Sequence, residues 1–138
     1  MIYNTQTDKK WADYVYDKTL KEKYTIGKTG CLITSLANIF AQTPQEFAEV
    51  TKKCYNNGYM DQDKVEIIME YKRKKVSLSE VKQDRDYIIY FFWTDKQYRH
   101  FSNLLKKTAH GVKVFNVYNG NHDNVNAEDI ICILEVTQ

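Results

Sequence analysis

The hydrophobic pattern of this 138-residue chain changes its period once, and the change divides the sequence into a helical half and a strand half. Between residues 31 and 72, apolar residues recur every three to four positions, which is typical of amphipathic helices. From residue 76 onward, the pattern alternates or becomes continuously apolar over short runs, which is typical of strands. Helices followed by strands predict an α+β domain, in which N-terminal helices pack on a C-terminal antiparallel sheet.

Three helices are expected in the first half, after an irregular or extended arm over residues 1–30. The first covers residues 31–41, with Gly30 as a permissible start, and its apolar residues occupy two adjacent faces, so it should be largely buried. The second begins at Thr43, which forms a capping box with Glu46 and is followed by Pro44 at the first helical position. The third fits residues 61–72. The residues expected on the buried faces of the last two helices are Phe47, Val50, Cys54, Val65, Ile68 and Met69.

The second half contains five strand candidates, over residues 76–78, 86–93, 100–106, 111–119 and 129–136. The run over residues 86–93 is apolar throughout, which predicts a central strand. Residues 107–111 supply a turn between the third and fourth candidates, so these two should form a hairpin. Residues 119–124 are polar and are expected to form a loop.

Length and charge limit the classes of protein that the chain can belong to. A length of 138 residues is enough for one domain, 1–138, and not for a second core. The net charge of +2 argues against a dedicated nucleic-acid binder. The first residues lack the charge and apolar run of a signal peptide, and the longest apolar run, residues 87–93, is too short to span a membrane. We therefore expect a cytoplasmic protein, with export or association with a virion left open.

The cysteine count leaves at least one free thiol, because three cysteines cannot all pair. Cys54 and Cys132 lie on apolar faces of predicted elements and are expected to be core residues. Cys31 would lie at the N-terminus of a helix, where the helix dipole lowers the pKa of a thiol and favours the thiolate. The spacing of the cysteines and of the three histidines fits no metal site, and no cofactor is expected.

A thiolate nucleophile needs a base, and His100 is the best-placed histidine. It would begin a strand, and Asn116 would lie on the hairpin partner of that strand, where its amide oxygen accepts from the imidazole and fixes the tautomer. His110 and His122 fall in predicted loops and are expected to be solvated.

The motifs around these residues resemble a known family. The block Gln6-Thr7-Asp8-Lys9-Lys10-Trp11, then Thr25-Ile26-Gly27, then Gly30-Cys31 and the following helix look like the start of papain-like cysteine peptidases. The most similar group is the bacteriocin-leader-processing, double-glycine type, with its bacterial and phage relatives. Arg99-His100-Phe101-Ser102 and residues 114–120 are similar to the His strand of that group and to the strand after it. The resemblance spans roughly residues 3–120.

This resemblance implies a papain-like fold and a thiol hydrolase that cleaves a peptide or amide bond without a cofactor. Cys31 would be the nucleophile, His100 the general base and Asn116 the orienting residue, where the group more often has Asp. Gln6 would be the oxyanion-hole side chain, assisted by the backbone N–H of Cys31. The chain departs from the group in having Val117 where a Pro is usual, and residues 102–105 in place of a glycine-rich strand.

Two alternatives remain open from the sequence. The unusual strand after His100 also fits a catalytically silent papain-like binding protein, such as a phage-encoded inhibitor, a host-interaction protein or a virion protein. The same triad also supports an acyltransferase or a deamidase, because the triad sets the acyl chemistry and not the acceptor. The partner is accordingly a peptide or protein substrate, or a host protein, rather than a nucleic acid or a membrane.

Three further features have ordinary structural interpretations. The basic run over residues 72–75 is expected to be a solvated helix C-terminus rather than a phosphate contact. Trp11 is expected to anchor the N-terminal arm by packing. The tyrosines at positions 14, 16, 24, 55 and 59 are expected to cover the edge of a core rather than to form a binding surface.

Overall fold

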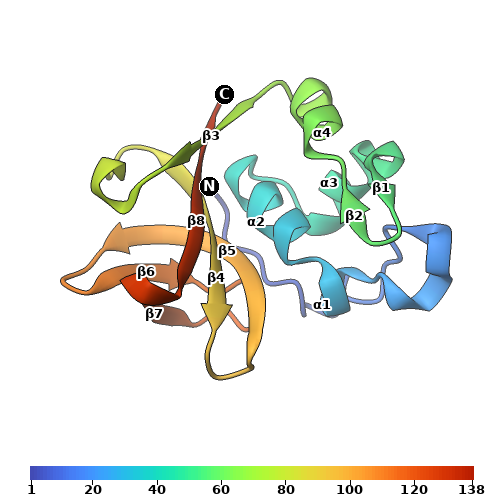
Figure 1. The fold of residues 1–138 in the computed structure, drawn as a ribbon. Helices are drawn as coiled ribbons and strands as arrows, with labels where there is room; N and C mark the ends of the chain where they lie inside the picture. The colour runs from blue at the N-terminus through green and yellow to red at the C-terminus, as the bar shows by residue number, and fades with distance from the viewer.

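Apart from a two-stranded hairpin between the third and fourth helices, the helices precede the strands as the change of period predicts, and the helices and the main sheet form two layers (Figure 1). The computed structural model describes residues 1–19 and 23–138. The helices are α1 (Ile26–Thr29), α2 (Cys31–Ile39), α3 (Pro44–Val50) and α4 (Gln62–Met69). The strands are β1 (Tyr55–Asn56), β2 (Tyr59–Met60), β3 (Lys72–Val76), β4 (Asp86–Trp93), β5 (Tyr98–Lys107), β6 (Gly111–Phe115), β7 (His122–Asn126) and β8 (Ile130–Thr137). The α+β prediction is confirmed.

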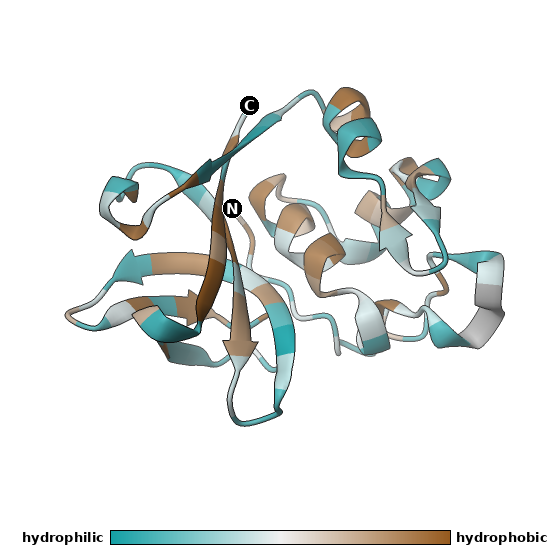
Figure 2. Ribbon diagram, viewed as in Figure 1, coloured by the Kyte–Doolittle hydropathy of each residue, from teal (hydrophilic) through white to brown (hydrophobic). Residues whose placement is uncertain are grey.

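Strands β3 to β8 form one antiparallel six-stranded sheet in the order β3-β8-β4-β5-β6-β7. Strand β4 lies between β8 and β5, so the central strand predicted from its apolar run is confirmed. Its side chains alternate between two cores. Ile88 faces the helices, whereas Ile89 and Phe91 face a second core that the sheet encloses as it curls. Figure 2 shows the apolar character of α2, β4 and β8 where these cores form.

Helix α2 lies against β5, and the backbone before it explains where it begins. Gly30 is its N-cap, and a Cβ atom at this position would lie 2.6 Å from the Ile26 carbonyl oxygen, so a side chain does not fit there. From Ile33 to Ile39 every residue is buried, as expected for a helix that is apolar on two faces. Cys31 is therefore the first residue of a buried helix, as predicted.

The capping box of the second helix is also confirmed. The Thr43 side chain accepts from the Glu46 N–H at 3.1 Å, and the Glu46 carboxylate accepts from the Thr43 N–H at 2.9 Å. The helix ends at Val50, which is 53% exposed, so the prediction that Val50 is buried was wrong. Cys54 lies beyond the helix, in a short 3-10 turn, and is buried as expected.

The third helix ends earlier than predicted. Glu70 adopts a left-handed conformation with φ of 55° and stops α4 at Met69. Val65 is fully buried and Met69 packs on the core, but Ile68 is 42% exposed, so its inward placement was wrong. The basic run that follows is not a helix end, because it forms the edge strand β3. Lysines on an edge strand protect its unpaired backbone from pairing with another chain.

Other differences concern the strands. Residues 119–124 were expected to form a loop, but residues 122–124 belong to strand β7, which pairs with β6. Strand β6 ends at Phe115, so Asn116 lies just beyond the strand rather than in its middle.

The Asn57-Gly58 pair, with φ of 52° and 81°, turns the small β1–β2 hairpin. Trp11 is buried in the helical core, as its predicted anchoring role requires.

Candidate functional site

Two buried asparagines hold helix α2 against strand β5, and so set the distance between the ends of the two elements. Asn38 Nδ2 donates to Asn103 Oδ1 at 2.8 Å, and Asn103 Nδ2 donates to the Ser35 carbonyl at 2.9 Å. Both side chains have no exposed surface. The N-terminal arm completes the network, because Asn38 exchanges hydrogen bonds with the backbone of Asn4. Asn103 stands where the resembling family has a glycine-rich strand, and here it has a clear structural task.

Cys31 lies where α2 meets β5 and is half-buried. Its thiol faces the backbone N–H of Phe101, the residue after His100. Burial raises the pKa of the Cys31 thiol, and N–H groups of Phe101, Leu32 and Cys31 itself lower it by a smaller amount. The expected thiolate at the helix N-terminus is therefore not found: removal from water outweighs the favourable backbone dipoles. At neutral pH the resting sulfur carries its proton.

His100 and Asn116 come together as the hairpin prediction requires. His100 Nε2 lies 2.9 Å from Asn116 Oδ1, and both side chains are almost completely buried. The pairing of β5 with β6 carries Asn116 past the end of β6 to a position beside His100. Among the residues that the structure describes, no hydrogen bond joins the Cys31 sulfur to the imidazole. The structure thus brings the thiol to the peptide next to His100, and His100 to Asn116.

Aromatic rings enclose the imidazole of His100. Trp93 stacks on it with ring centroids 5.0 Å apart, while Phe91 and Tyr98 contact it edge-on at 5.7 and 6.0 Å. This burial lowers the pKa of His100 to about 4, although the hydrogen bond to Asn116 and the charge of Asp123 act in the opposite direction. His100 is consequently neutral at physiological pH, which is the form that can accept a proton.

Gln6 is buried close to the same region, but its amide donors point elsewhere. Its backbone N–H donates to the Val117 carbonyl at 2.6 Å, which places the residue beside the Asn116 segment. Its side-chain Nε2 lies 3.1 Å from the Gly27 carbonyl and 3.4 Å from the Ile26 carbonyl, which it meets as a donor. Both carbonyls belong to α1, so the amide nitrogen of Gln6 is directed at this helix. The geometry ties the N-terminal arm to α1, and it leaves no Gln6 donor aimed at Cys31.

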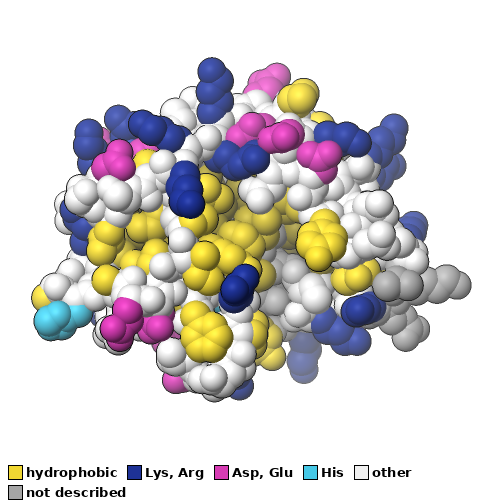
Figure 3. Space-filling view, viewed as in Figure 1, with side chains coloured by type: hydrophobic (Ala, Val, Ile, Leu, Met, Phe, Trp, Pro, Cys, Tyr) yellow, Lys and Arg dark blue, Asp and Glu magenta, His cyan; other side chains and the backbone are white. Residues whose placement is uncertain are grey.

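A pocket of about 360 Å³ opens beside Cys31. Its walls come from the start of α2, from the β1–β2 hairpin and from the helix-facing side of the sheet, and they include Tyr16, Tyr55, Tyr90 and Phe101. Figure 3 shows hydrophobic side chains gathered in a hollow between the strands and the helices on the face drawn. The nucleophile candidate therefore borders a largely apolar, aromatic pocket.

The tyrosines only partly follow the expectation that they cover a core edge. Tyr16 is buried in the helical core, and Tyr14, Tyr24 and Tyr55 pack against it. Tyr59 is 80% exposed on the hairpin at the rim of the pocket, so for this residue the expectation was wrong. Buried Asp17 holds the hairpin in place by accepting from the Gly58 N–H at 2.8 Å.

The remaining cysteines and histidines are not part of this site. Cys54 is buried, whereas Cys132 is only half-buried on β8 and so is not the core residue that was expected. His110 and His122 are exposed as expected, although His122 belongs to a strand and not to a loop. Within residues 1–19 and 23–138, no group of three or more His, Cys, Asp or Glu side chains is arranged to hold a metal ion. In the same part of the chain, no helix has the length and hydropathy to cross a membrane.

The sequence interpretation missed three residues that shape the site: Asn38, Asn103 and Asp123. Asn38 and Asn103 interrupt otherwise apolar faces, and such an interruption is a signal of a buried polar contact. Asp123 lies in a polar stretch with no periodicity, so nothing local distinguishes it.

No protein-family model, curated protein or solved structure matches the chain.

Proposed function

We propose that the protein is a papain-like thiol hydrolase that cleaves a peptide or amide bond with Cys31, His100 and Asn116. The observation that carries this proposal is the buried His100–Asn116 hydrogen bond of 2.9 Å, next to a peptide whose N–H faces the Cys31 thiol. A purely structural core has little use for a histidine that is held neutral, stacked on a tryptophan and hydrogen-bonded to a buried amide. The resemblance to bacterial and phage cysteine peptidases supports the same assignment.

The chemistry follows from the protonation states at rest. Asn116 Oδ1 accepts from the Tyr118 N–H at 3.0 Å, which identifies the amide atom that faces His100 Nε2 as the oxygen. Because this oxygen can only accept, Nε2 carries the proton, and Nδ1 has the free lone pair. As the Cys31 sulfur attacks the substrate carbonyl, its proton passes to Nδ1. The imidazolium then protonates the leaving amine, and a thioester remains on Cys31. A water molecule, deprotonated by the same nitrogen, hydrolyses this thioester and restores the thiol.

The developing oxyanion needs a donor, and the start of α2 supplies one. The first N–H groups of a helix have no partner within the helix, and the N–H of Cys31 is the first of α2. The oxyanion role implied for Gln6 by the resemblance is not part of this proposal, because the amide donors of Gln6 point to the Ile26 and Gly27 carbonyls.

An activated ester tests the proposal without knowledge of the natural substrate. The protein is incubated with the p-nitrophenyl ester of N-acetyl-phenylalanine, whose ring fits the aromatic pocket, and acylation of each cysteine is followed by mass spectrometry. We expect rapid, transient acylation of Cys31, abolished in Cys31→Ala and strongly slowed in His100→Ala. His122→Ala is the matched control, because His122 is exposed. Acylation of Cys31 no faster than that of Cys132, or unaffected by His100→Ala, would overturn the proposal.

The raised pKa of Cys31 and its missing hydrogen bond to His100 favour a second candidate, a binding protein that keeps the fold without turnover. The same ester experiment separates the two, because a silent site gives no His100-dependent acylation. Adding an amine acceptor to the acylated protein then distinguishes hydrolysis from acyl transfer by the mass of the product. A cytoplasmic location and a host protein partner remain predictions.

A further inference from the structure

We propose that Asp123 is a positioning residue of the site: it binds the amide of Asn116, directs the Asn116 oxygen to His100, and places a carboxylate one hydrogen bond away from the imidazole. This inference deepens the proposed function and rests on it. Asp123 would be a fourth member of the proposed site, after Cys31, His100 and Asn116. Its carboxylate also accounts for an asparagine at position 116, where the peptidases that the chain resembles more often have an aspartate.

The orientation of the Asn116 amide is determined from both ends. Its Nδ2 donates to Asp123 Oδ2 at 2.9 Å, and a carboxylate oxygen can be bonded only by a donor. Its Oδ1 accepts from the Tyr118 N–H at 3.0 Å, and a backbone N–H can be bonded only by an acceptor. A rotation of the amide by 180° would break both hydrogen bonds. The atom that faces His100 Nε2 is therefore the oxygen, and Nε2 carries the proton.

The sheet explains why Asp123 reaches this position. Strand β7 pairs with β6 so that Asp123 lies opposite Val114, two residues before Asn116. The turn between the strands is closed around Asn116 itself, whose N–H donates to the Asn121 carbonyl at 2.8 Å and whose carbonyl accepts from the Gly120 N–H at 2.7 Å. Asn116 is completely buried, and Asp123 is half-buried. The amide thus bridges a sealed histidine to a carboxylate that still contacts water.

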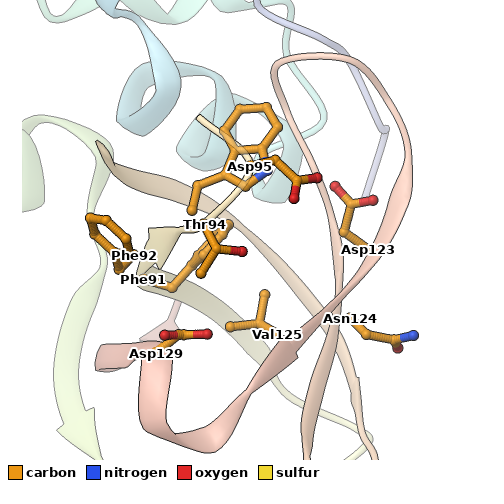
Figure 4. Close-up of a pocket in the computed structure, with 9 residues that line it drawn as sticks. Phe91, Phe92, Thr94, Asp95, Asp123, Asn124, Val125 and Asp129 are labelled. Carbon is orange, nitrogen blue, oxygen red and sulfur yellow. The ribbon is translucent and has the colours of Figure 1, made fainter. Parts of the chain in front are cut away.

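Asp123 is in contact with water through a pocket of about 120 Å³ on the side of the sheet away from the helices. Figure 4 shows the carboxylates of Asp95 and Asp123 at one end of this pocket, and Asp129 at the other. Among the described hydrogen bonds, only that of Asp123 connects one of these three carboxylates to Asn116. Asp129 lines the same pocket, so it provides a matched control.

The negative charge of Asp123 would stabilise the His100 imidazolium that forms in the proposed reaction. When the thiol proton passes to His100, a buried imidazolium forms among Trp93, Phe91 and Tyr98, none of which carries a negative charge at neutral pH. The titratable groups recorded against it are Tyr98, whose ring contacts the imidazole edge-on, and Asp123, which is linked to it through Asn116. Of these, Asp123 alone is an anion in the resting site. Its carboxylate compensates the imidazolium through the polarised Asn116 amide.

Three variants separate the orienting effect of Asp123 from the effect of its charge. Asp123→Ala removes both. Asp123→Asn removes the charge but keeps an oxygen that can accept from Asn116 Nδ2. The exchange Asn116→Asp with Asp123→Asn moves the carboxylate next to His100 and allows one hydrogen bond between the two positions with its direction reversed, from the amide at 123 to the carboxylate at 116. Asp129→Ala and Asp129→Asn are the controls, because they remove a carboxylate from the same pocket without touching Asn116.

The first measurement is the tautomer of His100 at pH 7, read from the ring nitrogens by ¹⁵N NMR. We expect the Nε2–H form alone in the wild type, in Asp123→Asn and in the exchanged variant, and a detectable Nδ1–H form in Asp123→Ala. The second measurement is the rate of Cys31 acylation by the activated ester. We expect about a tenfold loss in Asp123→Asn, as for one pKa unit of imidazolium stabilisation, and recovery in the exchanged variant.

The inference is overturned if Asp123→Ala leaves the tautomer unchanged and Asp123→Asn leaves the acylation rate unchanged, or if the Asp129 variants produce the same effects. The NMR measurement does not depend on turnover. A wild type that fails to acylate at Cys31, but whose tautomer responds to Asp123→Ala, would refute the hydrolase proposal and keep the positioning role of Asp123. The two failures are therefore distinguishable.

Discussion

Two buried asparagine networks border the site, and they differ in how they end. The Asn38–Asn103 pair joins α2 to β5, and its hydrogen bonds lead to each other and to backbone groups of Ser35 and Asn4. The Asn116 network joins β5 to the β6–β7 turn, and it leads at one end to a histidine and at the other to a carboxylate. The first network is closed within the backbone, and the second connects two titratable groups.

This difference indicates different tasks. A closed, fully buried network fixes the relative position of two elements, and disrupting it costs stability, because each buried polar group loses its partner. A network that ends on a histidine and an aspartate can hold or move a proton. The predictions below test this division, in which Asn103 mainly supports stability and Asn116 mainly supports chemistry.

The largest effect on stability is expected from Asn103→Ala. The change removes two hydrogen bonds at a completely buried position and leaves the Asn38 amide with one acceptor fewer. We expect the free energy of unfolding, measured by urea denaturation, to fall by about 3 kcal/mol. Exposed Asn124→Ala serves as the control and should be nearly neutral. A loss below about 1 kcal/mol for Asn103→Ala would remove the contrast between the two networks.

The second effect concerns pH. In the unfolded chain, His100 takes up a proton as the pH falls through about 6.5. In the folded protein, its pKa is lowered to about 4, so it takes up a proton only as the pH falls through about 4. The stability contribution is therefore complete above pH 6.5 and is lost as the pH falls toward 4, with a total of about 3 kcal/mol.

The measurement compares urea denaturation of the wild type and of His100→Gln at several pH values in this window. Carboxylates that titrate in the same range affect both proteins, so their difference isolates His100. We expect the wild type to lose more stability than His100→Gln between pH 6.5 and 4. Parallel pH profiles would show that the imidazole is not held in its neutral form.

The third prediction returns to the Asn116 network. Asn116→Ala removes the acceptor of His100 Nε2, so the imidazole loses the group that fixes its tautomer. We expect acylation of Cys31 by the activated ester to slow by about a hundredfold, or about 2.7 kcal/mol in the barrier. Its cost in unfolding free energy should be smaller than that of Asn103→Ala. The opposite ranking of the two variants in either assay would contradict the division of tasks.

The sequence predicted those parts of the fold that depend on local rules. The capping box at Thr43, the helix start at Cys31 and the apolar strand over residues 86–93 follow from nearest neighbours and periodicity, and all three are confirmed. The end of α4 was missed, because the left-handed residue that stops it is Glu70 and not the glycine or proline that usually signals a helix end. Strand β7 was missed because it has only one buried residue, Val125.

The site was predictable where two residues belong to one hairpin, as His100 and Asn116 do. It was not predictable where the partner comes from a strand without a hydrophobic pattern, as with Asp123, or where burial competes with a dipole, as at Cys31. The helix N-terminus is present and its effect on the thiol has the predicted sign, but desolvation is larger. A sequence shows the dipole, and only the structure shows how much water remains at the sulfur.

The smallest effect is expected at Gln6. Gln6→Ala removes the contacts of the amide with the Gly27 and Ile26 carbonyls, and we expect a loss of about 1–2 kcal/mol in unfolding free energy. Removing a true oxyanion donor costs about 10²–10³ in rate. Because the Gln6 donors point at α1, the acylation rate should fall less than tenfold. A larger fall would mean that the Gln6 amide turns toward Cys31 when an acyl group is bound, and it would place Gln6 with Asn116 rather than with Asn103.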